Sequence, residues 1–275
     1  MLFNNKLSMD FKSYIKNWGS NFKNYTLDPV LITKQMKSHI NNCRICRGPI
    51  TFYTICQDKY LSQLFVQQLH WRIPKLFFSG TGNEFTRGVY NNFPPNYVMK
   101  MTHGCGGKEC VSVVNKKVIN KRIISSFNSY KKWMSDKFVI CEEYLLDKNS
   151  SKYPIDYKCY VFNGVVKYIC IIRRSLKTAS LYTVDFKRKL KFKGINENME
   201  NIMLSERALE TMKKYCRDLS MFKNLFLRVD FYVINDAVVF GEFTPNPHNG
   251  HHYSSEMIML MNKDIYLMKK NNESI

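Results

Sequence analysis

Long apolar runs are missing from this sequence, and none reaches the roughly 18 apolar residues that suggest a membrane-spanning helix. The first residues, "MLFNNKLSMDFKSYIKNW", have neither the apolar core nor the small-residue cleavage site of a secretory signal. These two absences favour a cytoplasmic protein. They leave room only for a peripheral association with a membrane, which would be at its inner face.

Acidic residues are scarce relative to basic ones, with 22 Asp and Glu against 42 Lys and Arg and a net charge of +20 over 275 residues. Such an excess favours an anionic partner, such as a nucleotide, an acidic polymer, a nucleic acid or an anionic membrane surface. A Lys- and Asn-rich composition can equally reflect codon usage alone. The hydrophobic fraction of 45% excludes a disordered chain.

The nine cysteines are an odd number and are scattered, which favours free thiols in a reducing compartment over a disulfide framework. Cys43 and Cys46 in "CRIC" have the spacing of half a zinc site. A structural zinc site needs four ligands, and no second pair follows at a matching distance. We therefore expect free cysteines that are at least partly buried.

Residues 1–75 are expected to be mostly helical. "DPVLITKQMKSHINN" starts with Asp28 as a candidate N-cap and Pro29 at the first helical position, and Asp58 is the candidate cap of "DKYLSQLFVQQLHW". Further on, Asn163-Gly164 predicts a hairpin turn, and Ser205 is the candidate cap of an amphipathic helix. The expected strands are "KLFFSGTG", "YVMKM", "CVSVV", "KFVICEEYLL", "IDYKCYVF", "VVKYICIIRR" and "SLYTVDF"; helices are expected in the second half of 115–134 and over 254–268.

A glycine-rich loop, "THGCGGKE", lies between the strands "YVMKM" and "CVSVV". Gly104, Gly106 and Gly107 would let the backbone approach a phosphate closely, with Lys100 just before them. The loop matches neither a Walker A motif nor a dinucleotide fingerprint. Taken alone, a tight structural turn explains it better.

The segment "LFLRVDFYVINDAVVFGEFTPNP" predicts a hairpin with two carboxylates among apolar residues. A three-residue loop at 235–237 would place Asp230 opposite Glu242 and Arg228 opposite Thr244 on one face. A two-residue loop would place Asp230 opposite Gly241 instead. Facing carboxylates repel unless a cation lies between them, so they indicate a Mg²⁺ site or, less favoured, a solvated charged pair. The opposite, apolar face would carry Phe231, Val233, Val239 and Phe243.

Five segments, in order, resemble the ATP-grasp superfamily, and more closely its TupA-like branch, which is linked to teichuronopeptide and other polysaccharide biosynthesis. They are "QDKYLSQLFV", "YVMKMTHGCGG", "VICEEYLLD", "YPIDYKCYVFNG" and "LRVDFYVINDAVVFGEFTPNPHNG". The resemblance implies an α+β ATP-grasp fold with two α+β subdomains clasping ATP and a mostly helical N-terminal region. The expected divisions are 1–95 (helical, with a short strand), 96–146 (phosphate lid and adenine hinge) and 147–275 (metal-binding hairpin).

The resemblance also implies roles for individual residues. Lys59, Lys100 and Lys158 would neutralise phosphates under the Gly104–Gly107 backbone, and Asp156 would lie near the ribose. Arg228 would stabilise an acyl phosphate, and His103 would carry a proton or contact phosphate, although a simple loop hydrogen bond explains it equally well. The adenine would be held by Glu142, Glu143, Tyr144 and Leu145, and the Mg²⁺ ligands would be Asp230, Glu242 and either Thr244 or Asn246.

Many ATP-grasp enzymes carry Glu-x-Asn at the metal, whereas Thr244 follows Glu242 here, as in the TupA-like pattern. His248, His251 and His252 come soon after and are expected to be substrate contacts or loop residues rather than a histidine metal site.

The implied activity is ADP-forming ligation of a carboxylate to an amine through an acyl phosphate. The substrates would be an acidic glycan or glycan precursor and an amino acid or other amine. Two alternatives stay open: a kinase that uses the same nucleotide site on a glycan or small molecule, and a basic nucleic-acid-binding protein. "NKKVINKR" and "FKRKLKFK" permit the last alternative, but no nucleic-acid motif accompanies them, so no specific nucleic acid is expected.

Overall fold

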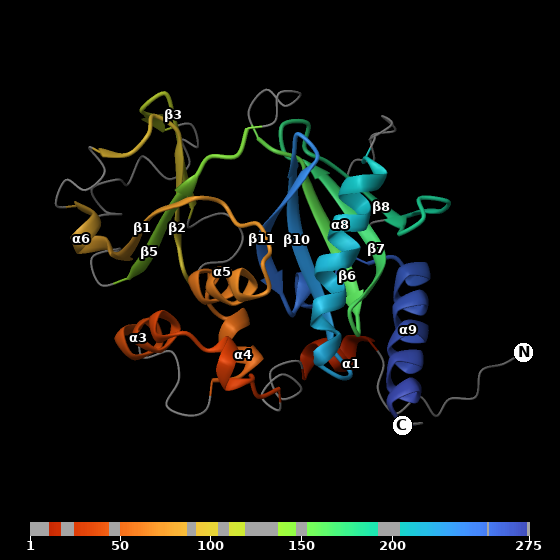
Figure 1. The fold of residues 1–275 in the computed structure, drawn as a ribbon. Helices are drawn as coiled ribbons and strands as arrows, with labels where there is room; N and C mark the ends of the chain where they lie inside the picture. Colours follow the sequence, from red (N-terminus) through yellow and green to blue (C-terminus); the bar gives the residue numbers. More distant parts are fainter. Residues whose placement is uncertain are drawn as a thin grey trace, which may run out of the picture. The chain divides into compact units, whose positions relative to one another are not determined.

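The computed structural model describes residues 11–17, 25–43, 50–86, 92–103, 110–118, 137–146, 153–191, 204–251 and 253–273. The chain divides into two compact units. Unit 1 comprises Met1–Thr26, Thr51–Tyr53 and Leu146–Ile275, and unit 2 comprises Leu27–Ile50 and Thr54–Leu145. Residues 1–95 therefore contribute to both units. Each unit is built on its own antiparallel sheet (Figure 1).

Unit 2 holds a five-stranded sheet in the order β1-β5-β2-β3-β4. Its strands are β1 (Leu76–Thr81), β2 (Tyr97–Met101), β3 (Cys110–Val114), β4 (Lys117–Val118) and β5 (Phe138–Glu143), and its helices are η1 (Pro29–Leu31), α3 (Lys34–Cys43), α5 (Lys59–Gln68) and α6 (Gly82–Thr86). Helix α4 (Phe52–Cys56) begins in unit 1 and ends in unit 2. Buried side chains from β2, β3 and β5 pack with Phe85 of α6 into one core.

The helix starts of unit 2 follow from capping. Asp58 caps α5 as predicted, since its Oδ1 accepts a hydrogen bond from the backbone N–H of Leu61 at 2.9 Å. The helix predicted to run from Asp28 is instead two elements, η1 and α3. Ile32 has an extended backbone that interrupts the helix, and the hydroxyl of Thr33 restarts it by accepting from Met36 N at 3.1 Å.

Unit 1 holds a six-stranded sheet in the order β11-β10-β6-β7-β8-β9. Its strands are β6 (Asp156–Phe162), β7 (Val165–Arg173), β8 (Thr178–Thr183), β9 (Lys189–Leu190), β10 (Phe226–Ile234) and β11 (Ala237–Thr244). Its helices are α1 (Phe11–Lys16), α8 (Glu206–Arg217), η4 (Asp218–Met221), η5 (Pro247–Gly250) and α9 (Ser255–Glu273). The Asn163-Gly164 turn and the Ser205 cap of α8 are both confirmed.

The two faces of this sheet are covered by different helices. Tyr160 and Phe162 of β6 lie in a buried cluster with apolar residues of α1 and α9. The neighbouring Cys159 points the other way, and its Sγ lies 3.8 Å from the Sδ of Met212 in α8. Because side chains alternate along a strand, Asp156 and Lys158 share the α1/α9 face with Tyr160. That face therefore changes from aromatic to charged along β6.

The β10–β11 hairpin has the predicted pairing but reaches it differently. The turn is Asn235-Asp236, both with positive φ, and Ile234 pairs with Ala237, so the three-residue loop was wrong. A β-bulge between the Asp230–Glu242 and Phe231–Phe240 pairs then shifts the register by one residue at Gly241. Beyond the bulge Asp230 faces Glu242, and Arg228 faces Thr244.

The two-residue turn also corrects the predicted apolar face of this hairpin. Val239 pairs with Tyr232 and so lies on the face of Asp230, whereas Phe240 pairs with Phe231 on the opposite face. The sequence had predicted Val239 to lie on the same face as Phe231. Because the turn has two residues rather than three, each β11 side chain between the turn and the bulge lies on the face of the sheet opposite to the predicted one.

Candidate functional site

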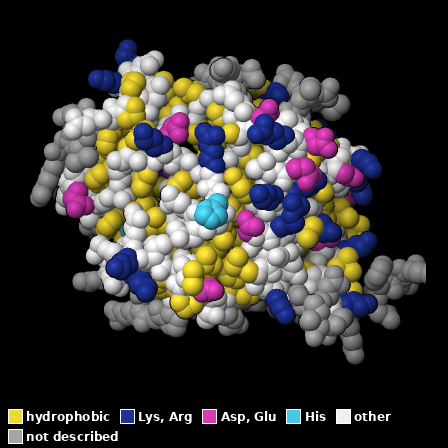
Figure 2. All heavy atoms as spheres, viewed as in Figure 1, with side chains coloured by type: hydrophobic (Ala, Val, Ile, Leu, Met, Phe, Trp, Pro, Cys, Tyr) yellow, Lys and Arg dark blue, Asp and Glu magenta, His cyan; other side chains and the backbone are white. Residues whose placement is uncertain are grey.

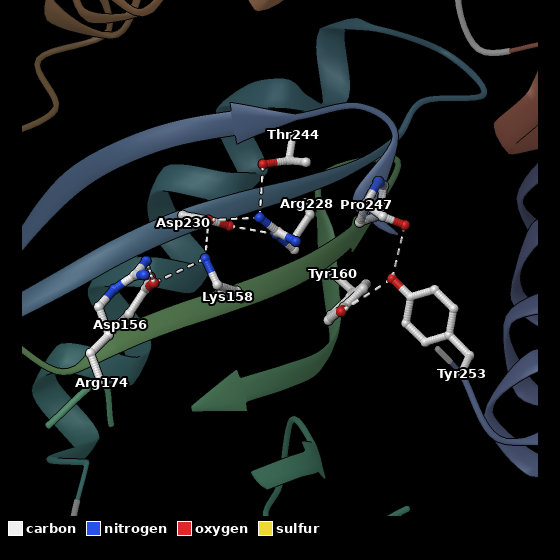
Figure 3. A network of polar contacts seen from close by, with 9 residues as sticks. All are labelled: Asp156, Lys158, Tyr160, Arg174, Arg228, Asp230, Thr244, Pro247 and Tyr253. Atoms are coloured by element: carbon white, nitrogen blue, oxygen red, sulfur yellow. Dashed lines mark hydrogen bonds and ion pairs between the residues drawn. The ribbon is translucent and has the colours of Figure 1, made fainter. Parts of the chain in front are cut away.

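A buried cluster of alternating charges lies on one face of β6 and β10 in unit 1 (Figure 3). Lys158 of β6 pairs with Asp230 of β10 in the ladder, and its Nζ hydrogen-bonds to Asp230 Oδ2. Lys158 Nζ also lies 3.0 Å from Asp156 Oδ2. Arg228 donates two hydrogen bonds to the same Asp230, from Nε to Oδ1 at 2.7 Å and from Nη2 to Oδ2 at 2.9 Å. Asp230 therefore accepts from two cations at once.

Burial and charge together set the ionisation of this cluster. Burial by itself would raise the pKa of Asp230, but Arg228 and Lys158 lower that pKa to about 2. Burial would lower the pKa of Lys158, yet Asp230 and Asp156 raise it. Asp230 is only 2% exposed and Lys158 6%. Both groups are thus charged at neutral pH, and each depends on the other for its charged state.

Arg174 extends the cluster toward solvent, since its Nη2 donates to Asp156 Oδ2 at 2.8 Å while its side chain is half exposed. At the other end, Arg228 Nη2 donates to the hydroxyl of Thr244 at 3.0 Å. Figure 3 shows this line of side chains running from Arg174 through Lys158 and Asp230 to Thr244. Sequence reasoning missed Arg174, because only the β6–β7 pairing, in which Asp156 lies opposite Ile172, brings the end of β7 to Asp156.

Glu242 and Thr244 are in register with Asp230 and Arg228 and are partly buried. The charge of Glu242 acts on both Arg228 and Lys158, which places its carboxylate on the same face. Asn246 precedes η5, and His248 and His251 are both exposed there. His252 lies outside the described residues. The ladder register confirms the predicted pairing of Asp230 with Glu242 and of Arg228 with Thr244.

A tyrosine pair supports the end of this site. The hydroxyl of Tyr253 lies 3.3 Å from the carbonyl oxygen of Pro247 and 3.3 Å from the hydroxyl of Tyr160 (Figure 3). Tyr160 is the ladder partner of Arg228. Both tyrosines are buried, and their hydroxyls are satisfied by these contacts. The pair ties the turn after β11 to the strand beside Arg228.

A second polar group lies in unit 2, on β2, β5 and α5. Lys100 Nζ is ion-paired with Glu142 Oε1, and Gln63 Nε2 donates to Glu142 Oε2 at 2.7 Å. Glu142 is 2% exposed, while Lys100 is partly exposed. Lys100 and Glu142, predicted separately for phosphate and adenine, thus contact each other directly. Gln63 was not predicted, because glutamine is usually exposed and nothing in the sequence marks this one as buried.

The other predicted adenine-binding residues follow Glu142 along the same segment. Glu143 is exposed, and Tyr144 and Leu145 are buried. Glu143 N donates to the carbonyl oxygen of Lys75 at 2.8 Å, which fixes the end of β5 beside the start of β1.

The first residues after β2 meet the start of α5. Lys59 N donates to Thr102 O at 2.8 Å, which places the partly buried Lys59 beside the end of β2. The buried Asp58 carboxylate lies 3.0 Å from His39 Nε2 and 3.5 Å from His103 Nδ1. His103 is the last described residue before the glycine loop. Gly104, Gly106 and Gly107 lie outside the described residues.

The residues predicted to bind Mg²⁺ all offer oxygen atoms as donors. Asp230 and Glu242 face each other in the ladder, and Thr244 and Asn246 follow, so every donor is an oxygen. A hard cation such as Mg²⁺ prefers such a set. In the described ranges no group of three or more His, Cys, Asp or Glu is arranged to hold a metal. The residues thus fit a cation that two carboxylates hold together with other oxygens, and not a histidine- or cysteine-rich site.

The cysteines in the described part of the chain are free thiols. Cys43 is partly buried, and burial together with nearby Asp58 raises its pKa to about 12; Cys46 lies outside the described residues.

On the face drawn in Figure 2, Lys and Arg side chains are spread among Asp and Glu rather than gathered in one continuous patch. Among the helices that are described, none combines the length and apolar composition that crossing a membrane requires.

The two antiparallel sheets and the accompanying helices agree with the α+β ATP-grasp fold that the sequence predicted. The family model "TupA-like ATPgrasp" matches residues 41–259, which is most of the chain. The protein belongs to the TupA-like ATP-grasp family.

Solved structures with similar folds include D-alanine–D-alanine ligases from three organisms. The Helicobacter pylori enzyme is 16% identical with a TM-score of 0.49, over 78% of this chain and 61% of that one. The Bacillus anthracis enzyme complexed with ATP is 18% identical with a TM-score of 0.47, over 79% and 68%. The Coxiella burnetii enzyme is 13% identical with a TM-score of 0.49, over 81% and 60%. This chain thus spans about three fifths of the H. pylori enzyme. Comparison with curated proteins gave no match.

Proposed function

We propose that the protein is an ATP-dependent carboxylate–amine ligase that forms an amide bond and releases ADP and phosphate. The observation that carries the proposal is the buried Lys158–Asp230–Arg228 cluster, in register with Glu242, within a chain of the ATP-grasp family. Buried charges are costly to maintain, so a cluster of this kind indicates a site that handles charged ligands.

In unit 2, we assign Lys100 and Lys59 to the phosphates of ATP. The ion pair with Glu142 fixes the Lys100 ammonium at the end of its strand, and α5 starts at Lys59. Glu142 to Leu145 would hold the adenine, mainly through main-chain groups. Catalysis would then come from positioning and charge neutralisation, as phosphoryl transfer generally requires.

In unit 1, Asp156 would accept from the ribose and Lys158 would contact phosphate. Asp156 Oδ1 is buried and accepts no hydrogen bond within the described structure, so it has an acceptor to offer. Asp230 and Glu242, with Thr244 or Asn246, would hold Mg²⁺, which would neutralise phosphate charge. Arg228, already aimed by Asp230 and Thr244, would stabilise the acyl phosphate and the charge that develops on amine attack.

His103 would carry the proton that the attacking amine must lose. Its side chain is 43% exposed, although Asp58 beside it is buried. Burial lowers the pKa of His103, Asp58 raises it, and His39, Lys59 and Lys137 lower it, for a net lowering. A neutral imidazole at physiological pH is able to accept a proton.

For the substrates, we propose an acidic glycan or glycan precursor as the carboxylate and an amino acid or other amine as the nucleophile. This would place the enzyme in polysaccharide biosynthesis in the cytoplasm, with peripheral contact to the inner face of the membrane. The net charge of +20 supports an acidic substrate through electrostatic attraction.

The test is a matrix of carboxylates and amines, with ADP, AMP and phosphate measured for each pair. We expect ADP and phosphate only when both substrates are present, and uronate-bearing glycans should be the most active carboxylates. Release of AMP would refute the acyl-phosphate route. ADP formation with a stable phosphorylated product and no amine would instead establish a kinase.

A further inference from the structure

A chain of hydrogen bonds in unit 2 runs from the start of α5 to His103. Asp58, Thr102 and His39 are all buried, whereas the side chain of His103 reaches solvent. Thr102 hydrogen-bonds to the Asp58 carboxylate, and its Oγ1 lies 2.9 Å from His103 Nδ1. Neither Asp58 nor Thr102 has a role in the proposed function so far.

The direction of each hydrogen bond in this chain follows from its buried end. Burial raises the pKa of Asp58, but the hydrogen bond and charge of His39, together with the Leu61 N–H and Thr102 contacts, lower it overall. The carboxylate is therefore ionised and can only accept. Thr102 has one hydroxyl proton, which it donates to Asp58. Its oxygen is then an acceptor toward His103.

The Thr102 oxygen determines which ring nitrogen of His103 carries the proton. Thr102 Oγ1 at 2.9 Å requires a proton on His103 Nδ1, and the Asp58 carboxylate at 3.5 Å favours the same proton. In a neutral imidazole with Nδ1 protonated, Nε2 is the acceptor. The same carboxylate also faces His39 Nε2 at 3.0 Å, and His39 Nδ1 lies 3.5 Å from the Sγ of Cys43. The buried end of the chain is thus held by further contacts.

We propose that Asp58 and Thr102 are positioning residues that keep His103 in the Nδ1–H tautomer, so that Nε2 is the atom that takes the proton from the amine nucleophile. This rests on the proposed ligase function. In that step the amine nitrogen bonds to the acyl carbon, the bond from that carbon to the phosphate oxygen breaks, and phosphate leaves. The N–H proton passes to His103 Nε2.

The tautomer is measured directly by NMR of protein labelled with ¹⁵N-histidine, without any substrate. We expect the His103 signals of the wild type to show Nδ1–H, with assignment from the missing signals of His103→Asn. In Asp58→Asn the amide can still cap α5, because Asn caps helices as well as Asp does. Its N–H₂ group would donate to Thr102, which then donates to His103 Nδ1 and shifts the proton to Nε2. Wild-type protein in the Nε2–H form would overturn the proposal.

Thr102 supplies a matched pair of variants should Asp58→Asn not fold. Thr102→Ser keeps the hydroxyl and should keep the Nδ1–H tautomer, whereas the near-isosteric Thr102→Val should increase the Nε2–H fraction. Identical tautomer populations in Ser and Val variants would show that Thr102 does not position the ring.

Kinetics give a second readout. Loss of the oriented base in Asp58→Asn should lower kcat by about 10²- to 10⁴-fold, the usual share of general acid–base catalysis, with KM for ATP unchanged. Since the Asp58 charge raises the pKa of His103, its removal should also move the rising limb of the pH–rate profile to lower pH. His39, Lys59 and Lys137 also act on His103 and are unaltered. An unmoved limb with wild-type kcat contradicts the proposal. Absence of ADP release with every substrate pair would refute only the ligase function, because the tautomer is measured separately.

Discussion

Asp230 lies directly across the β10–β11 ladder from Glu242, although the turn that joins the strands would by itself pair Asp230 with Gly241. The β-bulge at Gly241 makes up the difference of one residue. Two carboxylates therefore share a face that also carries Arg228 and Lys158. The following predictions depend on that arrangement and on the Lys100 group of unit 2.

Glu242→Gln should abolish turnover and leave the fold intact, because the side chain is only partly buried and its shape is kept. Loss of an outer-shell partner of a metal already costs about 10- to 100-fold, so loss of a ligand should lower kcat/KM by at least about a hundredfold. ADP release measures the effect, and circular dichroism checks the fold. Glu210→Gln on the exposed face of α8 is the matched control. Full activity of Glu242→Gln would show that Glu242 is not a Mg²⁺ ligand.

Gly241→Ala should disturb the register that aligns Asp230 with Glu242. A Cβ at Gly241 would lie 3.0 Å from the backbone oxygen of Asp230 and 3.2 Å from a ring carbon of Tyr232, and the backbone atom cannot move aside freely. We expect a loss of about 1–3 kcal/mol in the free energy of unfolding, typical of overpacking, together with weaker Mg²⁺ binding.

The control for that variant is Gly164→Ala in the β6–β7 turn. Gly164 has a φ of +80°, and its Cβ would lie 2.9 Å from Ser220, so this variant should also destabilise the fold. It does not touch Asp230 or Glu242. Mg²⁺ titration at a temperature where both variants are folded separates the two effects: equal weakening in both would indicate a general loss of stability rather than of register.

Asp230→Asn should be strongly destabilising, by about 3–5 kcal/mol, because it leaves Arg228 and Lys158 buried without their shared carboxylate. The pKa of Asp230 is about 2 in the fold and about 3.9 when unfolded. A lowered folded pKa contributes stability above the unfolded value, and that stability is lost as pH falls toward about 2. Denaturant unfolding from pH 6 to 2 should therefore show the gap between wild type and variant narrowing below about pH 4. A gap that does not change with pH would refute this ionisation.

Lys100→Met should weaken nucleotide binding. Because it leaves the buried Glu142 carboxylate with Gln63 but without its cation, it should also lower stability, so binding is measured where circular dichroism shows the variant to be folded. A hydrogen bond to a charged group contributes about 1.5–3 kcal/mol, which corresponds to a rise in Kd for ATP of roughly ten- to a hundredfold. Isothermal titration calorimetry measures the change. Lys117→Met removes an exposed lysine from the short strand β4 of the same sheet and should leave the Kd unaltered. Equal effects of the two variants would indicate a loss of general positive charge rather than of a phosphate contact.

Much of the fold could be predicted from local signals. Asp58 and Ser205 capped their helices as expected, and Asn163-Gly164 formed its turn, because capping and turn geometry depend on few neighbouring residues. The continuous helix from Asp28 was wrong, since an extended residue at Ile32 has no strong sequence signal. The pairing of Asp230 with Glu242 was predictable, because polar residues stand out within apolar strands, whereas the binding roles of these residues stay predictions.

The sequence by itself determined which residue types are available: the strand carboxylates, the lysines beside the glycine loop, and the family to which they belong. Only the tertiary structure decided how they meet. The pairing of β10 with β6 brings Lys158 to Asp230, and the end of β7 brings Arg174 to Asp156. The packing of α5 on the end of β2 links Asp58 to His103. These contacts join residues far apart in the chain, and strand order and register, which local patterns leave open, determine them.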